Sequence, residues 1–77
     1  MNAARRKAIQ DIRTGIDALK DDVENLRDEE QNYLDAMPEG LRQGDKGTTA
    51  DEAISSLEAA IASLEEAAGY LETAEGL

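Results

Sequence analysis

The sequence lacks the residues on which most small enzymes and metal proteins depend. Its 77 residues include no cysteine and no histidine. Without cysteine, the chain can form neither a disulfide nor a thiolate metal site. A nucleophile–base pair would have to use serine, lysine or carboxylates, and the three serines of the second half, Ser55, Ser56 and Ser63, have no partner at a suitable spacing. We therefore expect no enzymatic activity, no cofactor and no metal site.

Aromatic residues and long hydrophobic runs are also scarce. Tyr33 and Tyr70 are the only aromatic residues, so any core must be aliphatic. No stretch approaches the ~20 apolar residues that a bilayer span requires. Arg5, Arg6 and Lys7 are not followed by an apolar run, which argues against a secretory signal. The expected location is the cytoplasm, with no membrane partner.

Basic residues are outnumbered more than two to one. The chain has 18 acidic and 8 basic residues and a formal net charge of −10. Such a balance argues against direct binding to nucleic acid or to an anionic membrane. Partners that are basic, or that normally bind phosphate groups, fit it better.

The apolar residues that are present form two seams whose steps alternate between three and four. This is the a/d pattern of helices that pack side by side. The first seam contains Ile9, Ile12, Ile16, Leu19, Val23 and Leu26, and the second contains Ile54, Leu57, Ile61, Leu64, Ala68 and Leu71. The pattern predicts an all-α fold, a single domain over residues 1–77 built as an antiparallel two-helix coiled-coil hairpin. Because so small a core is marginal, we expect two hairpins to dimerise into a four-helix bundle.

The orientation of the two helices follows from charges that flank the seams at heptad position e. These are Arg6, Arg13, Lys20 and Arg27 in the first half and Asp51, Glu58, Glu65 and Glu72 in the second. Position e faces e only in an antiparallel pair, whereas in a parallel pair it would face the alanines at g. The predicted ion pairs are Arg6–Glu72, Arg13–Glu65, Lys20–Glu58 and Arg27–Asp51, and the predicted apolar layers run from Ile9–Leu71 to Leu26–Ile54. The same pairing between two chains would give a swapped dimer, which the pattern leaves open.

Glycine and proline mark one connection between the helices. The first helix is expected from about residue 3 to 37, with Asn2 as its N-cap and Pro38 ending it. Residues 38–48 form the predicted loop, in which Leu41 folds back towards Tyr33 and its neighbours. Thr49 and Glu52 read as a capping box for a second helix from about 49 to 75, stopped by Gly76.

Small residues line position g. Self-association is expected along them because small side chains let helices approach closely and widen the apolar face; they are Ala53, Ala60, Ala67, Ala74 and Gly15. The alternative is that alanine is present only as the best helix former. Tyr70, at an outward position, is either an interface anchor or a solvated side chain.

An acidic tract extends along the later part of the first helix. Its carboxylates recur about every 3 Å, close to the ~3.4 Å phosphate spacing of one DNA strand. The candidate partner-binding residues are Asp21, Asp22, Glu24, Asp28, Glu29, Glu30 and Asp35, with Asp51 and Glu52 nearby. They are either a surface for a basic groove or an ordinary solvated face. Glu30 stands at an a position, where burial of its charge is costly. Either the two helices separate there, or Arg42 or Lys46 forms an ion pair with Glu30.

Three stretches together resemble small acidic helical proteins of tailed bacteriophages and prophages. They are NAARRKAI at 2–9, RDEEQNYLDAMPEGLRQGDKG at 27–47 and AISSLEAAIASLEEA at 53–67. Small acidic phage proteins without catalytic residues often inhibit host machinery, as anti-CRISPR proteins and other DNA mimics do. The resemblance therefore implies a cytoplasmic inhibitor that blocks a basic nucleic-acid-binding groove of a host protein or nucleoprotein complex. The alternative is a structural or assembly module that self-associates along the alanines.

Overall fold

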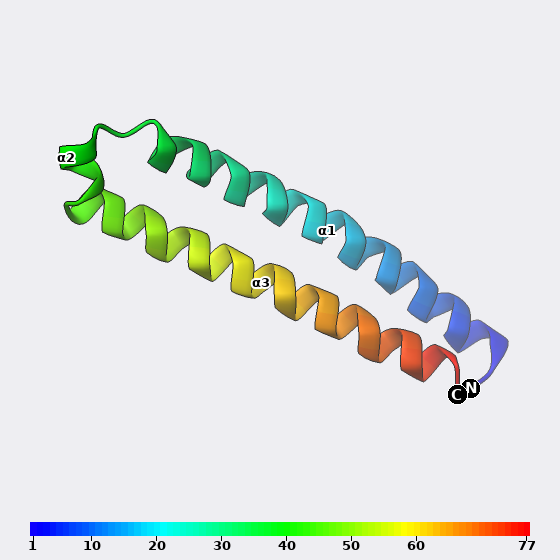
Figure 1. Ribbon diagram of the computed structural model, residues 1–77. Helices are drawn as coiled ribbons and strands as arrows, with labels where there is room; N and C mark the ends of the chain where they lie inside the picture. Colours follow the sequence, from blue (N-terminus) through cyan, green and yellow to red (C-terminus); the bar gives the residue numbers. More distant parts are fainter.

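The computed structural model describes residues 1–77 as a long helical hairpin. Its elements are α1 (Ala3–Asp35), α2 (Glu39–Arg42) and α3 (Asp45–Glu75), with no strand. The two long helices run antiparallel along their whole length, so that both chain ends lie together at the end opposite α2 (Figure 1). The molecule measures 58 × 15 × 11 Å. The expected all-α hairpin is confirmed, and the pairing occurs within one chain. No helix is both long and apolar enough to cross a membrane.

Helix α1 begins and ends near the positions that the sequence predicts. The Asn2 side chain accepts a hydrogen bond from the Arg5 amide at 2.8 Å, which satisfies one of the free N–H groups at the helix start. The helix ends at Asp35 with Ala36 as its C-cap, because Pro38 disfavours helical geometry at the residue before it.

The predicted capping box at Thr49 and Glu52 is wrong. Helix α3 begins four residues earlier, at Asp45, and its N-cap is Gly44. The early start depends on Gly47, which is buried where the α3 backbone meets Arg42. A β-carbon at Gly47 would overlap the Arg42 carbonyl group, so only glycine allows this close approach. Residues 38–48 are therefore mostly helical, and Gly76 is the C-cap at the far end of α3, as predicted.

Helix α3 buries the seam that its heptads predict. Ala50, Ile54 and Ile61 are buried, and Leu57, Leu64 and further a and d residues are half-buried. Leu34 of α1 packs with Ala50, Ile54 and Met37 to form the main core cluster next to the turn. Only 5 of the 77 residues are buried, so the lone hairpin has a very small core.

Helix α1 is rotated relative to the prediction. The residues at d, which we expected in the seam, are more than half exposed: Ile12 53%, Leu19 56%, Leu26 53% and Tyr33 51%. Their place beside α3 is taken by the e residues Arg13, Lys20 and Arg27, whose side chains are about one-third exposed. Such long side chains can cover apolar surface with their methylene groups while the charged ends stay in water. Helix α1 therefore faces α3 with positions a and e, and the prediction for its d residues, Tyr33 included, is wrong.

The register of the hairpin differs from the predicted one by one heptad. Arg13 lies 3.8 Å from Glu72 instead of pairing with Glu65, and Lys20 lies 3.8 Å from Glu65 instead of Glu58. Arg27 contacts Asp28 of its own helix, not Asp51. The basic residues at position e of α1 do face the acidic residues at position e of α3, as the antiparallel arrangement requires. The core cluster next to the turn agrees with the shifted register, because Leu34 packs there with Ala50 and Ile54.

Candidate protein-binding surfaces

One broad side of the hairpin carries an apolar face made of two rows. The large row is the exposed d set of α1, Ile12, Leu19, Leu26 and Tyr33. The alanine row is the g set of α3, namely Ala53, Ala60, Ala67 and Ala74, of which Ala60 is exposed and the others half-buried. Four large side chains exposed at heptad spacing exceed the scattered exposed apolar residues that a monomer surface normally shows.

Contacts at the turn show that both rows lie on the same side. Tyr33 lines a shallow depression with Lys46 and Thr49, and Lys46 precedes Ala53 by one heptad. On the other side, Leu34 and Asp51 line a separate depression. The large row and the alanine row thus share one face, whereas the acidic e residues of α3 lie on the other.

The two rows are also level with each other along the hairpin. The Arg13–Glu72 and Lys20–Glu65 pairs fix the heights of the helices. At these heights Ile12 lies beside Ala74, Leu19 beside Ala67, Leu26 beside Ala60 and Tyr33 beside Ala53. Each layer of the apolar face therefore contains one large and one small side chain.

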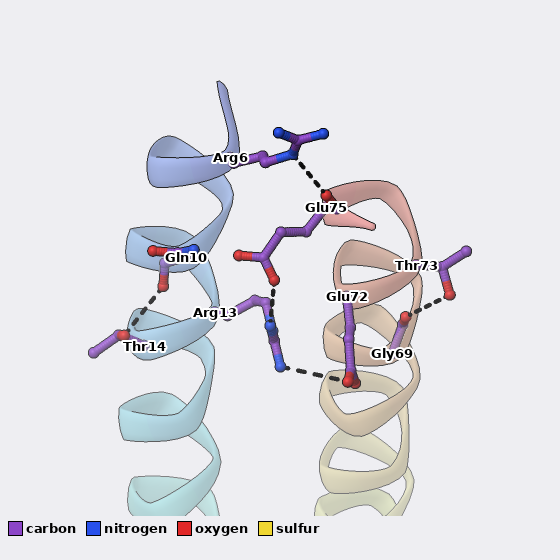
Figure 2. A network of polar contacts seen from close by, with 8 residues as sticks. All are labelled: Arg6, Gln10, Arg13, Thr14, Gly69, Glu72, Thr73 and Glu75. Carbon is purple, nitrogen blue, oxygen red and sulfur yellow. Dashed lines mark hydrogen bonds and ion pairs between the residues drawn. The ribbon is translucent and has the colours of Figure 1, made fainter. Parts of the chain in front are cut away.

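The terminal end of the hairpin is held by a polar network (Figure 2). Arg13 points between the helices and donates to the Glu75 carboxylate at 2.8 Å, with Glu72 at 3.8 Å. Arg6 Nε donates to the Glu75 backbone carbonyl at 3.1 Å. Glu75 is only 18% exposed, and its second carboxylate oxygen has no partner. These contacts assign Arg6 and Arg13 to the fold.

The nine acidic candidate residues lie around the turn half of the hairpin and do not gather on one face. Asp21, Asp28 and Asp35 follow the outer side of α1, whereas Asp22 and Glu29 border the large row. Their helical positions place the remaining four elsewhere: Glu24 on the opposite flank of α1, half-buried Glu30 towards α3, and Asp51 and Glu52 on α3.

Two basic residues of the turn lie close to a few of these carboxylates. Arg42 lies 3.7 Å from Asp35, which also accepts a hydrogen bond from Gln31 at 2.9 Å. Glu30 forms no ion pair and shares a shallow depression with Lys46. Between residues 23 and 60 there are ten carboxylates and three cationic side chains, so seven of the ten net negative charges belong to this half.

The remaining sequence candidates are exposed to solvent. A β-carbon at Gly15 would meet nothing within 4 Å, so α3 gives no reason for a glycine there. Tyr70 is 69% exposed and donates to Glu66 at 3.3 Å. Leu41 is half exposed and lines a depression with Tyr33 and Met37, close to where the sequence places it.

The large row is the feature that sequence analysis missed. The heptad pattern did not reveal it, because positions d and e of α1 both fit the place beside α3. The structure brings no group of three or more potential metal ligands together. Comparison with protein-family models, with curated proteins and with solved structures finds no match to this chain.

Proposed function

We propose that this chain is a non-enzymatic helical module that works by binding protein through its apolar face. One observation carries the proposal: four large side chains stand more than half exposed at heptad spacing on α1. Full burial of such a side chain is worth about 1.5–3 kcal/mol, so a partner that covered the exposed half would recover roughly half of that for each one. A helical partner can recover this free energy by knobs-into-holes packing against the row.

The test uses a photo-crosslinking amino acid placed at Leu19, within the large row. The matched probe replaces Thr14, which is exposed on the outer side of the same helix. We expect a covalent protein adduct from position 19 and none from position 14 when the full chain is irradiated in bacterial cells. An absence of adduct at position 19, or equal adducts at both positions, would overturn the proposal.

A second candidate function is supported by the uneven charge of the hairpin. The turn half could occupy a basic, nucleic-acid-binding groove of a host protein or nucleoprotein complex, as an anti-CRISPR protein or another DNA mimic does. This would be an inhibitor of bacteriophage origin acting in the bacterial cytoplasm. The ten carboxylates of residues 23–60, opposed by three cations, favour it.

Charge reversal tests this candidate. The Asp28→Lys, Glu29→Lys variant should no longer compete with duplex DNA for a basic DNA-binding protein, and competition by the wild type should weaken as salt rises. The matched control, Asp17→Lys with Glu66→Lys, makes the same change of charge in the terminal half at two exposed positions and should compete normally. Undiminished competition by the Asp28, Glu29 variant at low salt would rule the candidate out.

A further inference from the structure

We infer that the apolar face is occupied by a second copy of this chain, with the turns of both hairpins at the same end. The inference rests on the protein-binding role proposed above and names the partner. Its basis is that each row on the face has a complementary row on the same face, at the same height. The geometry follows from turning one hairpin by 180° about an axis parallel to its length.

In the first complementary pair of rows, the large side chains of α1 face the small side chains of α3. Under this rotation α1 of one copy lies over α3 of the other, so the large row lies over the partner's alanine row. Leu19 then meets the partner's Ala67, and Leu26 meets the partner's Ala60. Because the operation is symmetric, every layer contains two large and two small side chains, which fill the space between four helices evenly.

The second complementary pair of rows lies at the edge of the face. On α1 it is the g row Gly15, Asp22 and Glu29, and on α3 it is the c row Ser56, Ser63 and Tyr70. At the observed register Gly15 lies opposite the partner's Tyr70. The tyrosine side chain, which is 69% exposed in the hairpin, thus meets the one residue of α1 that has no side chain.

Polar residues follow the same correspondence. Asp22 lies opposite the partner's Ser63, and Glu29 lies opposite the partner's Ser56, so each carboxylate faces a hydroxyl that can donate to it. In the reverse orientation, with the turns at opposite ends, Asp22 would lie against the partner's Asp22. Like charges in such a position are destabilising. The edge of the face therefore favours turns at the same end.

The face is large enough for a stable dimer. From Ile12 to Tyr33 it extends roughly 32 Å at the helical rise per residue. Two helices of about 10 Å each make it about 20 Å wide, or about 630 Å² per copy, which is above the roughly 500 Å² per partner that a specific interface needs. This arrangement also explains the glycine at position 15, which would leave space for the partner's Tyr70. Within its own hairpin, nothing contacts a β-carbon at this position.

Two adjacent alanines provide the test of self-association. Ala60 belongs to the alanine row, whereas Ala59 lies on the outer side of α3, and both are exposed. We expect light scattering to give wild type and Ala59→Glu twice the 8.3 kDa chain mass and Ala60→Glu the mass of one chain. Circular dichroism should show equal helicity in all three proteins. A wild type of 8.3 kDa at millimolar concentration, or a dimeric Ala60→Glu, would overturn the inference.

Orientation is tested by a spin label at Gly40→Cys, because the chain has no other cysteine and a β-carbon at Gly40 meets nothing. With the turns together, the label-to-label distance should be less than half of the 58 Å hairpin length. A distance near that length would refute the proposed orientation. The crosslink at position 19 separates the two proposals: an adduct of twice the chain mass supports a second copy. An adduct of another mass overturns the second copy while the protein-binding role survives.

Discussion

The two long helices carry equivalent heptad patterns and use them differently. Helix α3 buries positions a and d, including Ile54 and Ile61, and leaves its acidic e residues in water. Helix α1 turns positions a and e towards α3, so that Arg13 and Lys20 are partly covered while Leu19 and Leu26 are exposed. The apolar surplus of the hairpin is therefore concentrated on one helix.

In this hairpin, the basic e residues of α1 take the place beside α3 that its d residues would otherwise fill. The arginine and lysine side chains cover the α3 seam with their methylene groups and reach the acidic residues beyond it. The displaced d residues then form a second seam on the side of the hairpin. A helix that is apolar over so wide an arc is typical of a bundle with more than two helices.

The largest expected effect comes from shortening one apolar side chain in each helix to alanine. Ile61→Ala should lower the free energy of unfolding by about 3 kcal/mol, because Ile61 is buried. Leu19→Ala should lower it by less than about 1 kcal/mol, because most of that side chain is already in water. Urea unfolding should be measured in the monomeric Ala60→Glu background, which removes the contribution of a second copy. Equal losses would show that α1 is not rotated as described.

The start of the α3 seam depends on the absence of a side chain. Gly47→Ala should destabilise the hairpin by about 2 kcal/mol, because the new β-carbon would overlap the Arg42 carbonyl. Thermal unfolding followed by circular dichroism measures the loss. Gly40→Ala is the control, since a β-carbon there meets nothing, and it should leave the unfolding temperature unchanged or raise it. If both variants were equally stable, α2 could not pack against α3 as closely as observed.

The cost of placing basic residues beside α3 can be measured at Lys20. Lys20→Leu should raise the free energy of unfolding by about 1 kcal/mol, because leucine would bury more apolar surface and the ion pair with Glu65 is long, at 3.8 Å. Lys7→Leu makes the same change on the exposed outer side of α1 and should give no gain. A loss of stability in Lys20→Leu would mean that its ion pair contributes more than its burial costs.

The smallest effect concerns two glycines within the helices. Gly69→Ala should stabilise the chain by about 0.8 kcal/mol through helix propensity alone, since a β-carbon there meets nothing. Gly15→Ala should give a similar gain in the monomeric background but weaken self-association, because the new methyl group would contact the partner's Tyr70. Sedimentation equilibrium compares the two variants. Equal association constants would place Gly15 outside the interface.

The sequence by itself determined that two helices form and that they run antiparallel. Heptad spacing marks an amphipathic helix regardless of its partner, and charges at e are complementary only in one direction. The sequence also placed Asn2 and Gly76 at helix ends, because capping is local. For the candidate site, it indicated the small residues at g and the excess of acid near the turn.

Only the tertiary structure decided the register, the rotation of α1 and therefore which residues are left exposed. The register is evident where Leu34 packs with Ala50 and Ile54, a contact between the helices that heptad spacing does not reveal. The rotation depends on competition between position d and position e for the same neighbour, and both choices fit one heptad pattern. That competition leaves Ile12, Leu19, Leu26 and Tyr33 exposed, because a single partner helix contacts only one side of α1.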